Sequence, residues 1–89
     1  MARVSFTQNL QRHLPCPPTR APGADLRAVL DAVFAENPPL RSYLLDDQGR
    51  IRKHVIIFLN NTPARDRIHL SDPVREDDEV FVFQALSGG

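Results

Sequence analysis

The stretch that decides the fold is HVIIFLNN, residues 54–61. Its first six residues are dense in β-branched and aromatic side chains, a composition typical of a strand. Asn60 and Asn61 follow, and asparagine tolerates the positive φ values that a tight turn requires. We therefore predict a strand over 54–59, a tight turn after it, and a brief pairing segment within 62–65.

Two further strands are predicted. ARVSFTQ at 2–8 alternates between apolar and polar side chains, which is the period of a half-buried strand. EVFVFQA at 79–85 is predicted as the last strand. Residues 14–23 hold four of the eight prolines. Because proline cannot donate to a sheet ladder, only a short returning strand within 18–21 is expected there.

A single amphipathic helix is predicted between these strands. Asp25 is suited to cap its first turn, and Asn37 ends it because the proline at 38 disfavours helical backbone in the residue before it. The apolar residues recur at helical spacing and form one stripe: Leu26, Val29, Leu30, Val33 and Phe34. Residues 40–45 are expected to add no more than a single turn, and 46–49 a loop.

These elements predict an α+β fold, a mixed sheet of four to five strands over one main helix. The 89 residues allow a single domain, 1–89. Eleven basic and eleven acidic residues balance, so nucleic acid and anionic membranes are not expected as main partners. No apolar run approaches the roughly 20 residues of a membrane span. The first residues do not resemble a signal peptide, and a cytoplasmic location is expected.

One helix cannot cover all the apolar residues of the two strongest strands, whose successive side chains point to opposite faces. The smaller set suits the helix: Val55, Ile57, Leu59, Val80 and Val82. The other set is expected on the open face, with His54 beside it: Ile56, Phe58, Phe81 and Phe83. An exposed apolar group of this size marks a protein-binding surface. The alternatives are that residues 38–50 fold over this face, or that two copies pair through it.

The sequence ends in Gly88-Gly89. A terminal glycine pair adds no packing but provides an arm without side chains that ends in a carboxylate. Leu86, Ser87, Gly88 and Gly89, when extended, reach roughly 13 Å beyond the last strand. We therefore expect a flexible tail over 86–89 that is long enough to thread a narrow channel in another protein.

The whole chain resembles the ThiS/MoaD family of ubiquitin-like sulfur carriers. Three segments carry the resemblance: Asp77-Asp78-Glu79-Val80, similar to the family's DGDEV turn; the strand 55–59 followed by Asn60; and the tail ALSGG, 85–89. The resemblance implies a β-grasp fold and a carboxylate, here that of Gly89, that an E1-like enzyme adenylates with ATP. A sulfur donor then converts it to a thiocarboxylate. It also implies a carrier that binds no cofactor and has no catalytic site of its own.

The family divides by the pathway that receives the sulfur. The long segment 44–54 before the central strand is similar to the carrier of cysteine biosynthesis, which serves a PLP-dependent cysteine synthase and whose cysteine adduct is cut by a metalloprotease. Gln84-Ala85 stands where the molybdopterin synthase small subunit typically carries proline, which counts against that branch. Two other classes stay open: a ubiquitin-like modifier conjugated to lysines through Gly89, and an interaction module whose tail is incidental.

No pattern indicates an active site or a metal site. His13, His54 and His69 share no metal-ligand interval with Cys16. Cys16 has no basic neighbour in sequence to lower its pKa, so we expect an inert surface thiol rather than a sulfur relay. The acidic run 76–79 shows no pair placed for acid–base work. The basic run 50–53 is expected to be solvated, with an acidic patch on a partner as the alternative.

Overall fold

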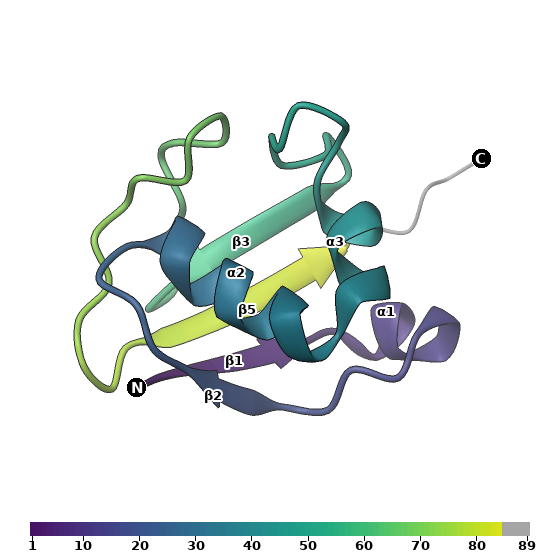
Figure 1. Cartoon of the computed structure of the whole chain (residues 1–89), viewed down its shortest axis with the longest axis horizontal. Coiled ribbons are helices and arrows are strands. Elements are labelled where there is room, and N and C mark those ends of the chain that lie inside the picture. The colour runs from purple at the N-terminus through teal and green to yellow at the C-terminus, as the bar shows by residue number, and fades with distance from the viewer. Residues whose placement is uncertain (85–89) are drawn as a thin grey trace.

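The computed structural model of the protein describes residues 1–84. In chain order the elements are β1 (Ala2–Phe6), α1 (Gln8–His13), β2 (Thr19–Ala21), α2 (Leu26–Glu36), α3 (Pro38–Leu44), β3 (Val55–Leu59), β4 (Thr62–Pro63) and β5 (Glu79–Gln84). The strands form one sheet in the order β2-β1-β5-β3-β4 (Figure 1). Because β5 runs parallel to β1 and antiparallel to β3, the sheet is mixed, as predicted.

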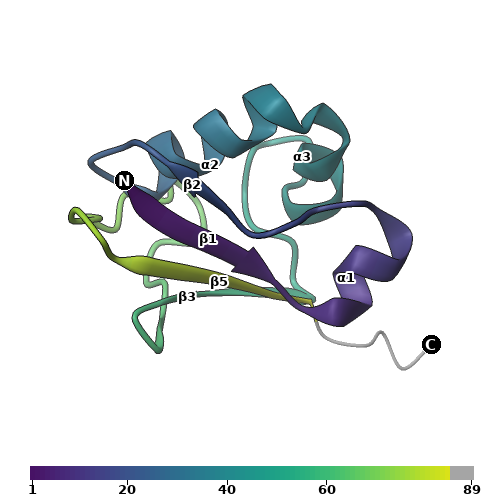
Figure 2. The same ribbon diagram turned by 90° about the horizontal axis from the view of Figure 1, so that it is seen from below.

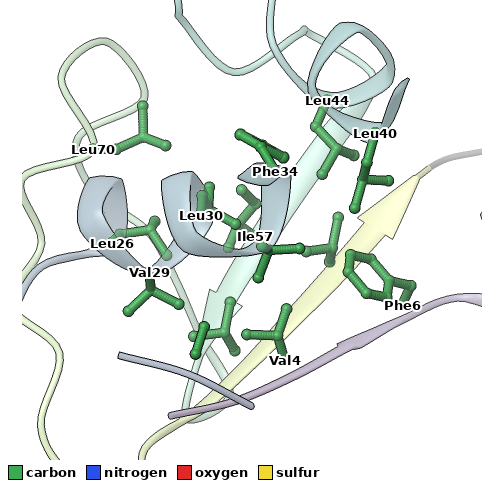
Figure 3. Packing of buried hydrophobic residues seen from close by; sticks show 14 of the residues in the cluster. Val4, Phe6, Leu26, Val29, Leu30, Phe34, Leu40, Leu44, Ile57 and Leu70 are labelled. Atoms are coloured by element: carbon green, nitrogen blue, oxygen red, sulfur yellow. The ribbon is translucent and has the colours of Figure 1, made fainter. Parts of the chain in front are cut away.

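Helices α2 and α3 cover one face of this sheet, whereas none of the described helices covers the other (Figure 2). The hydrophobic core lies between these layers, where side chains of the two helices meet those of β1, β3 and β5 (Figure 3). Val4, Ile57 and Val82 are at most 1% exposed there. The predicted inward set is confirmed except at Leu59, which is half-buried against the core.

The central hairpin follows the sequence prediction. Asn60 and Asn61 have φ values of 51° and 72°, and Leu59 pairs with Thr62 across the turn. Asparagine adopts this left-handed region at lower cost than most residues because its short side chain bonds locally. The pairing segment is shorter than the predicted 62–65, because β4 ends at Pro63.

The start of α2 is held by three hydrogen bonds. The Asp25 carboxylate accepts from the backbone N–H of Ala28 at 2.8 Å, as an N-cap does. The N–H groups of Leu26 and Arg27 donate to the carbonyls of Asp72 and Leu70, each at 2.9 Å. The first turn of α2 is therefore tied to the loop before β5 as well as to its own cap.

Two helices were not predicted. The first strand ends at Phe6 rather than at residue 8, and α1 follows with Leu10 fully buried, too short an apolar pattern to read from sequence. Residues 38–44 form α3 instead of a single turn. Proline has the backbone angle of a first helical turn and lacks an N–H that this turn leaves unpaired, so the prolines that end α2 also begin α3. None of the helices within residues 1–84 is long and apolar enough to cross a membrane.

Candidate functional site

The uncovered face of the sheet carries a contiguous apolar group, which we call the open-face patch: Ile56, Phe58, Phe81 and Phe83. Phe58 lies opposite Phe81, and Ile56 opposite Phe83, in the antiparallel pairing of β3 with β5. Both phenylalanines of β5 are 38% exposed, and the two residues of β3 are half-buried. The sheet register therefore joins two pairs into one surface, with the exposed His54 just before β3.

Polar residues border this patch on the side of β1. Ser5 lies opposite Phe81, and Arg3 opposite Glu79, with Arg3 and Glu79 in an ion pair at 3.8 Å. A shallow hollow of about 510 Å³ runs from Phe81 to Arg20 on β2. An apolar centre with a polar rim is the usual anatomy of a protein–protein interface. Sequence reasoning missed Arg3 and Ser5, although the alternation of β1 already places them opposite the buried Val4 and Phe6.

Residues 38–50 do not fold over the open-face patch. Leu40 and Leu44 of α3 are fully buried in the core on the helical side of the sheet. The following loop is closed by the Asp46 carboxylate, which accepts from the N–H of Arg50 at 3.0 Å. That alternative is wrong, because these residues complete the core layer.

The acidic run before β5 forms a closed turn. The Asp78 carboxylate accepts the N–H of Arg75 at 2.7 Å, and this hydrogen bond lowers the pKa of Asp78. Glu79 then donates its N–H to the Asn60 side chain at 2.9 Å, which joins the turn to the central hairpin. Asp77 has a φ of 66°. These residues position the start of β5, the strand that carries the patch.

Cys16 is buried, not a surface thiol. It is 2% exposed and belongs to the buried cluster that includes Phe6, Val33 and Leu40, because the proline-rich segment packs its small side chain inward. Burial raises its pKa, which lowers the fraction of reactive thiolate. His54 and His69 are exposed. In the part of the chain that the structure describes, no three His, Cys, Asp or Glu residues are placed to hold a metal ion.

The predicted tail contacts fall on Leu86, Ser87, Gly88 and Gly89, which lie outside the described residues. The last described residue, Gln84, pairs with Val55 at the start of β3. The patch residues Phe81 and Phe83 thus belong to the same strand that leads to the tail.

A comparison with protein families identifies the family of this chain. The model of the ThiS family matches residues 18–89, from β2 through the final glycine pair. The chain belongs to the ThiS family. The search of curated protein sequences found no match.

Solved structures show the same fold as this ThiS-family chain. SAMP1 from Haloferax volcanii is 23% identical, with a TM-score of 0.83 over 99% of this chain and 98% of that one. A chain of the Amycolatopsis orientalis BexX/CysO complex is 20% identical, with a TM-score of 0.84 over 100% of both chains. Mycobacterium tuberculosis CysO is 24% identical, with a TM-score of 0.81 over 97% of this chain and 100% of that one. The predicted ubiquitin-like β-grasp fold is therefore confirmed.

Proposed function

We propose that this ThiS-family chain is a sulfur carrier that works through the carboxylate of Gly89. An E1-like enzyme adenylates this carboxylate with ATP, and a sulfur donor converts the adenylate to a thiocarboxylate. The thiocarboxylate then delivers sulfur to a biosynthetic enzyme. The chain serves as a cosubstrate without a catalytic site of its own, and the nucleotide belongs to the activating enzyme.

The observation that carries this proposal is the family match, which continues through Gly88 and Gly89. A glycine pair adds nothing to a core, so its inclusion in the matched sequence calls for a role in chemistry rather than in folding. The open-face patch on β5 supplies a second element, a surface on which an enzyme is able to hold the body while it acts on the end of the chain.

The chemistry explains why a protein tail is used. A carboxylate is a poor electrophile, and its reaction with ATP gives an acyl adenylate and releases pyrophosphate. Sulfide that attacks the acyl carbon expels AMP and gives the thiocarboxylate directly. The terminal sulfur of a persulfide also expels AMP but gives an acyl disulfide, and a second thiol then breaks its S–S bond to leave the thiocarboxylate and a new disulfide. The product delivers a nucleophilic sulfur without free sulfide, and the partner enzymes supply orientation by binding the folded body.

The receiving pathway that we propose is cysteine biosynthesis, with a PLP-dependent cysteine synthase as acceptor and a metalloprotease that cuts the adduct. The long segment before β3 supports this choice, as does the likeness in fold to two CysO structures. One of these is a complex of CysO with BexX, which supports docking of such a body on a partner protein.

The test is an intact-mass measurement on the purified chain mixed with an E1-like enzyme from the same cell and ATP. We expect an acyl adenylate and, once a sulfur donor is added, the mass of a thiocarboxylate. Deletion of Gly89 should abolish both products without changing thermal unfolding. The matched control, Arg75→Gln at the opposite end of β5, should react as the natural chain does. An unmodified natural chain with every E1-like enzyme of that cell would refute the proposal.

A second candidate function is a ubiquitin-like modifier joined to lysines through Gly89, favoured by the likeness to SAMP1. It requires the same adenylation and differs in the final acceptor. Glycine–glycine remnants on lysines of cellular proteins, absent when the chain is deleted, would favour this reading. A thiocarboxylate with no such remnants would favour the carrier.

A further inference from the structure

A second surface feature lies at the end of the sheet where β5 finishes. It is a hollow of about 520 Å³, which we call the basic hollow. Its lining includes four cations and one histidine against a single carboxylate: Arg50, Arg52, Lys53, Arg67, His54 and Asp46. The basic run 50–53 was visible in the sequence, but Arg67 comes from the loop after β4 and was not connected with it.

Three of the four cations of the basic hollow, the arginines, are held in place. Arg52 Nε donates to the carbonyl of Ser42 at 2.9 Å, and Arg67 donates to the carbonyl of Arg52 at 2.6 Å. Arg50 pairs with Asp46 at 3.0 Å. A cation that is already ordered loses little side-chain entropy when a partner binds, so this arrangement suits recognition better than a freely solvated run does.

The basic hollow lies at the end of the sheet where β5 finishes, and β5 comes just before the tail residues in the sequence. Lys53 and His54 directly precede Val55, which pairs with Gln84 at the end of β5. The acidic turn 76–79 lies at the other end of this six-residue strand, about 17 Å away at 3.4 Å per residue. The chain has no net charge, yet positive charge gathers at the end from which residues 85–89 continue.

We propose that the basic hollow docks an acidic surface of the enzyme that activates the C-terminus. This inference rests on the proposed function, because an enzyme that reaches the residues after Gln84 must approach this end of the sheet. Complementary charge at such a contact speeds association and fixes orientation. The open-face patch supplies apolar contact area, and the basic hollow selects the end that faces the active site.

The experiment measures adenylation of the full chain at about 10 mM and about 150 mM salt, where the screening length is about 30 Å and about 8 Å. The double variant Arg52→Gln/Lys53→Gln should lower kcat/KM for the carrier about tenfold at low salt and much less at high salt. The loss should lie in KM, with kcat preserved. Arg65→Gln/Arg75→Gln removes the same charge elsewhere and should retain the natural rate and salt dependence.

Thermal unfolding separates a folding defect from a docking defect. Lys53→Glu serves the same purpose, because the natural Lys53 side chain has no hydrogen bond or ion pair to another residue within 1–84. The inference fails if the double variant keeps the natural salt dependence. It also fails if the loss appears in KM for ATP, which would assign the basic hollow to nucleotide phosphates. A natural chain that is never adenylated overturns the sulfur-carrier proposal together with this one.

Discussion

The alternation of β5 allows stability and partner binding to be separated with the same substituent at two neighbouring positions. Val82 is fully buried, and Phe81 is 38% exposed on the open-face patch. We predict that Val82→Asp unfolds the protein, whereas Phe81→Asp leaves it folded and impairs its activation.

The magnitudes follow from burial. A chain of 89 residues has a free energy of unfolding of about 4–13 kcal/mol. Val82→Asp forfeits about 1.5–3 kcal/mol of apolar burial and adds several kcal/mol for an unpaired carboxylate in the core. Phe81→Asp forfeits about 1–2 kcal/mol, because only part of its ring is buried, and about 1 kcal/mol of strand preference. The first loss approaches the whole stability, and the second does not.

The assay is urea unfolding followed by circular dichroism, together with the rate of adenylation by the E1-like enzyme. We expect Phe81→Asp to unfold cooperatively at a lower urea midpoint and to lose at least tenfold in kcat/KM, as residues central to an interface do. A folded Val82→Asp protein would contradict the assigned faces of β5. Natural activation of Phe81→Asp would contradict the binding role of the open-face patch.

Three further predictions concern local structure. Asp25→Ala should lower the free energy of unfolding by about 1 kcal/mol through loss of the α2 cap, and Asp25→Asn should restore most of it in the same urea assay. The N–H of His69 and the hydroxyl of Ser71 lower the pKa of Asp66 from its ordinary 3.8 to about 2. Its stabilising contribution is therefore present above pH 3.8 and lost as the pH falls toward 2, so Asp66→Asn should flatten that part of a stability–pH profile. Cys16 should react with a thiol reagent far more slowly in the folded protein than in urea, and fast labelling of the folded protein would contradict its burial.

The sequence was informative where one physical signal acted alone. The α2 stripe and its Asp25 cap, the alternation of β5 and the asparagine turn each depend on local chemistry, and the structure confirms them. The open face was predicted from the apolar residues left over, since one helix cannot cover two strands that are apolar on both faces. Its exposure is observed, and its role in binding stays a prediction.

The sequence was uninformative where distant contacts decide the outcome. Helix α3 begins at two prolines that local reasoning takes as a stop, and it is retained because Leu40 and Leu44 complete the core. Cys16 lies in a segment that looks exposed, yet it belongs to the buried cluster that also holds Phe6 and Val33. Arg67 joins the basic run through a hydrogen bond to a carbonyl fifteen residues away. None of these contacts leaves a periodic signal.

The direction in which β5 runs links the fold to the proposed chemistry. This strand begins in the acidic turn, carries Phe81 and Phe83 along its open side, and ends at Gln84 beside the basic hollow. An apolar patch alone fixes which face a partner contacts but allows the body to be rotated on it, because hydrophobic burial has no direction. Opposite charges at the two ends of the strand remove that freedom, since the reversed orientation brings like charges together. In this arrangement a chain with no net charge is able to present one particular end to an activating enzyme.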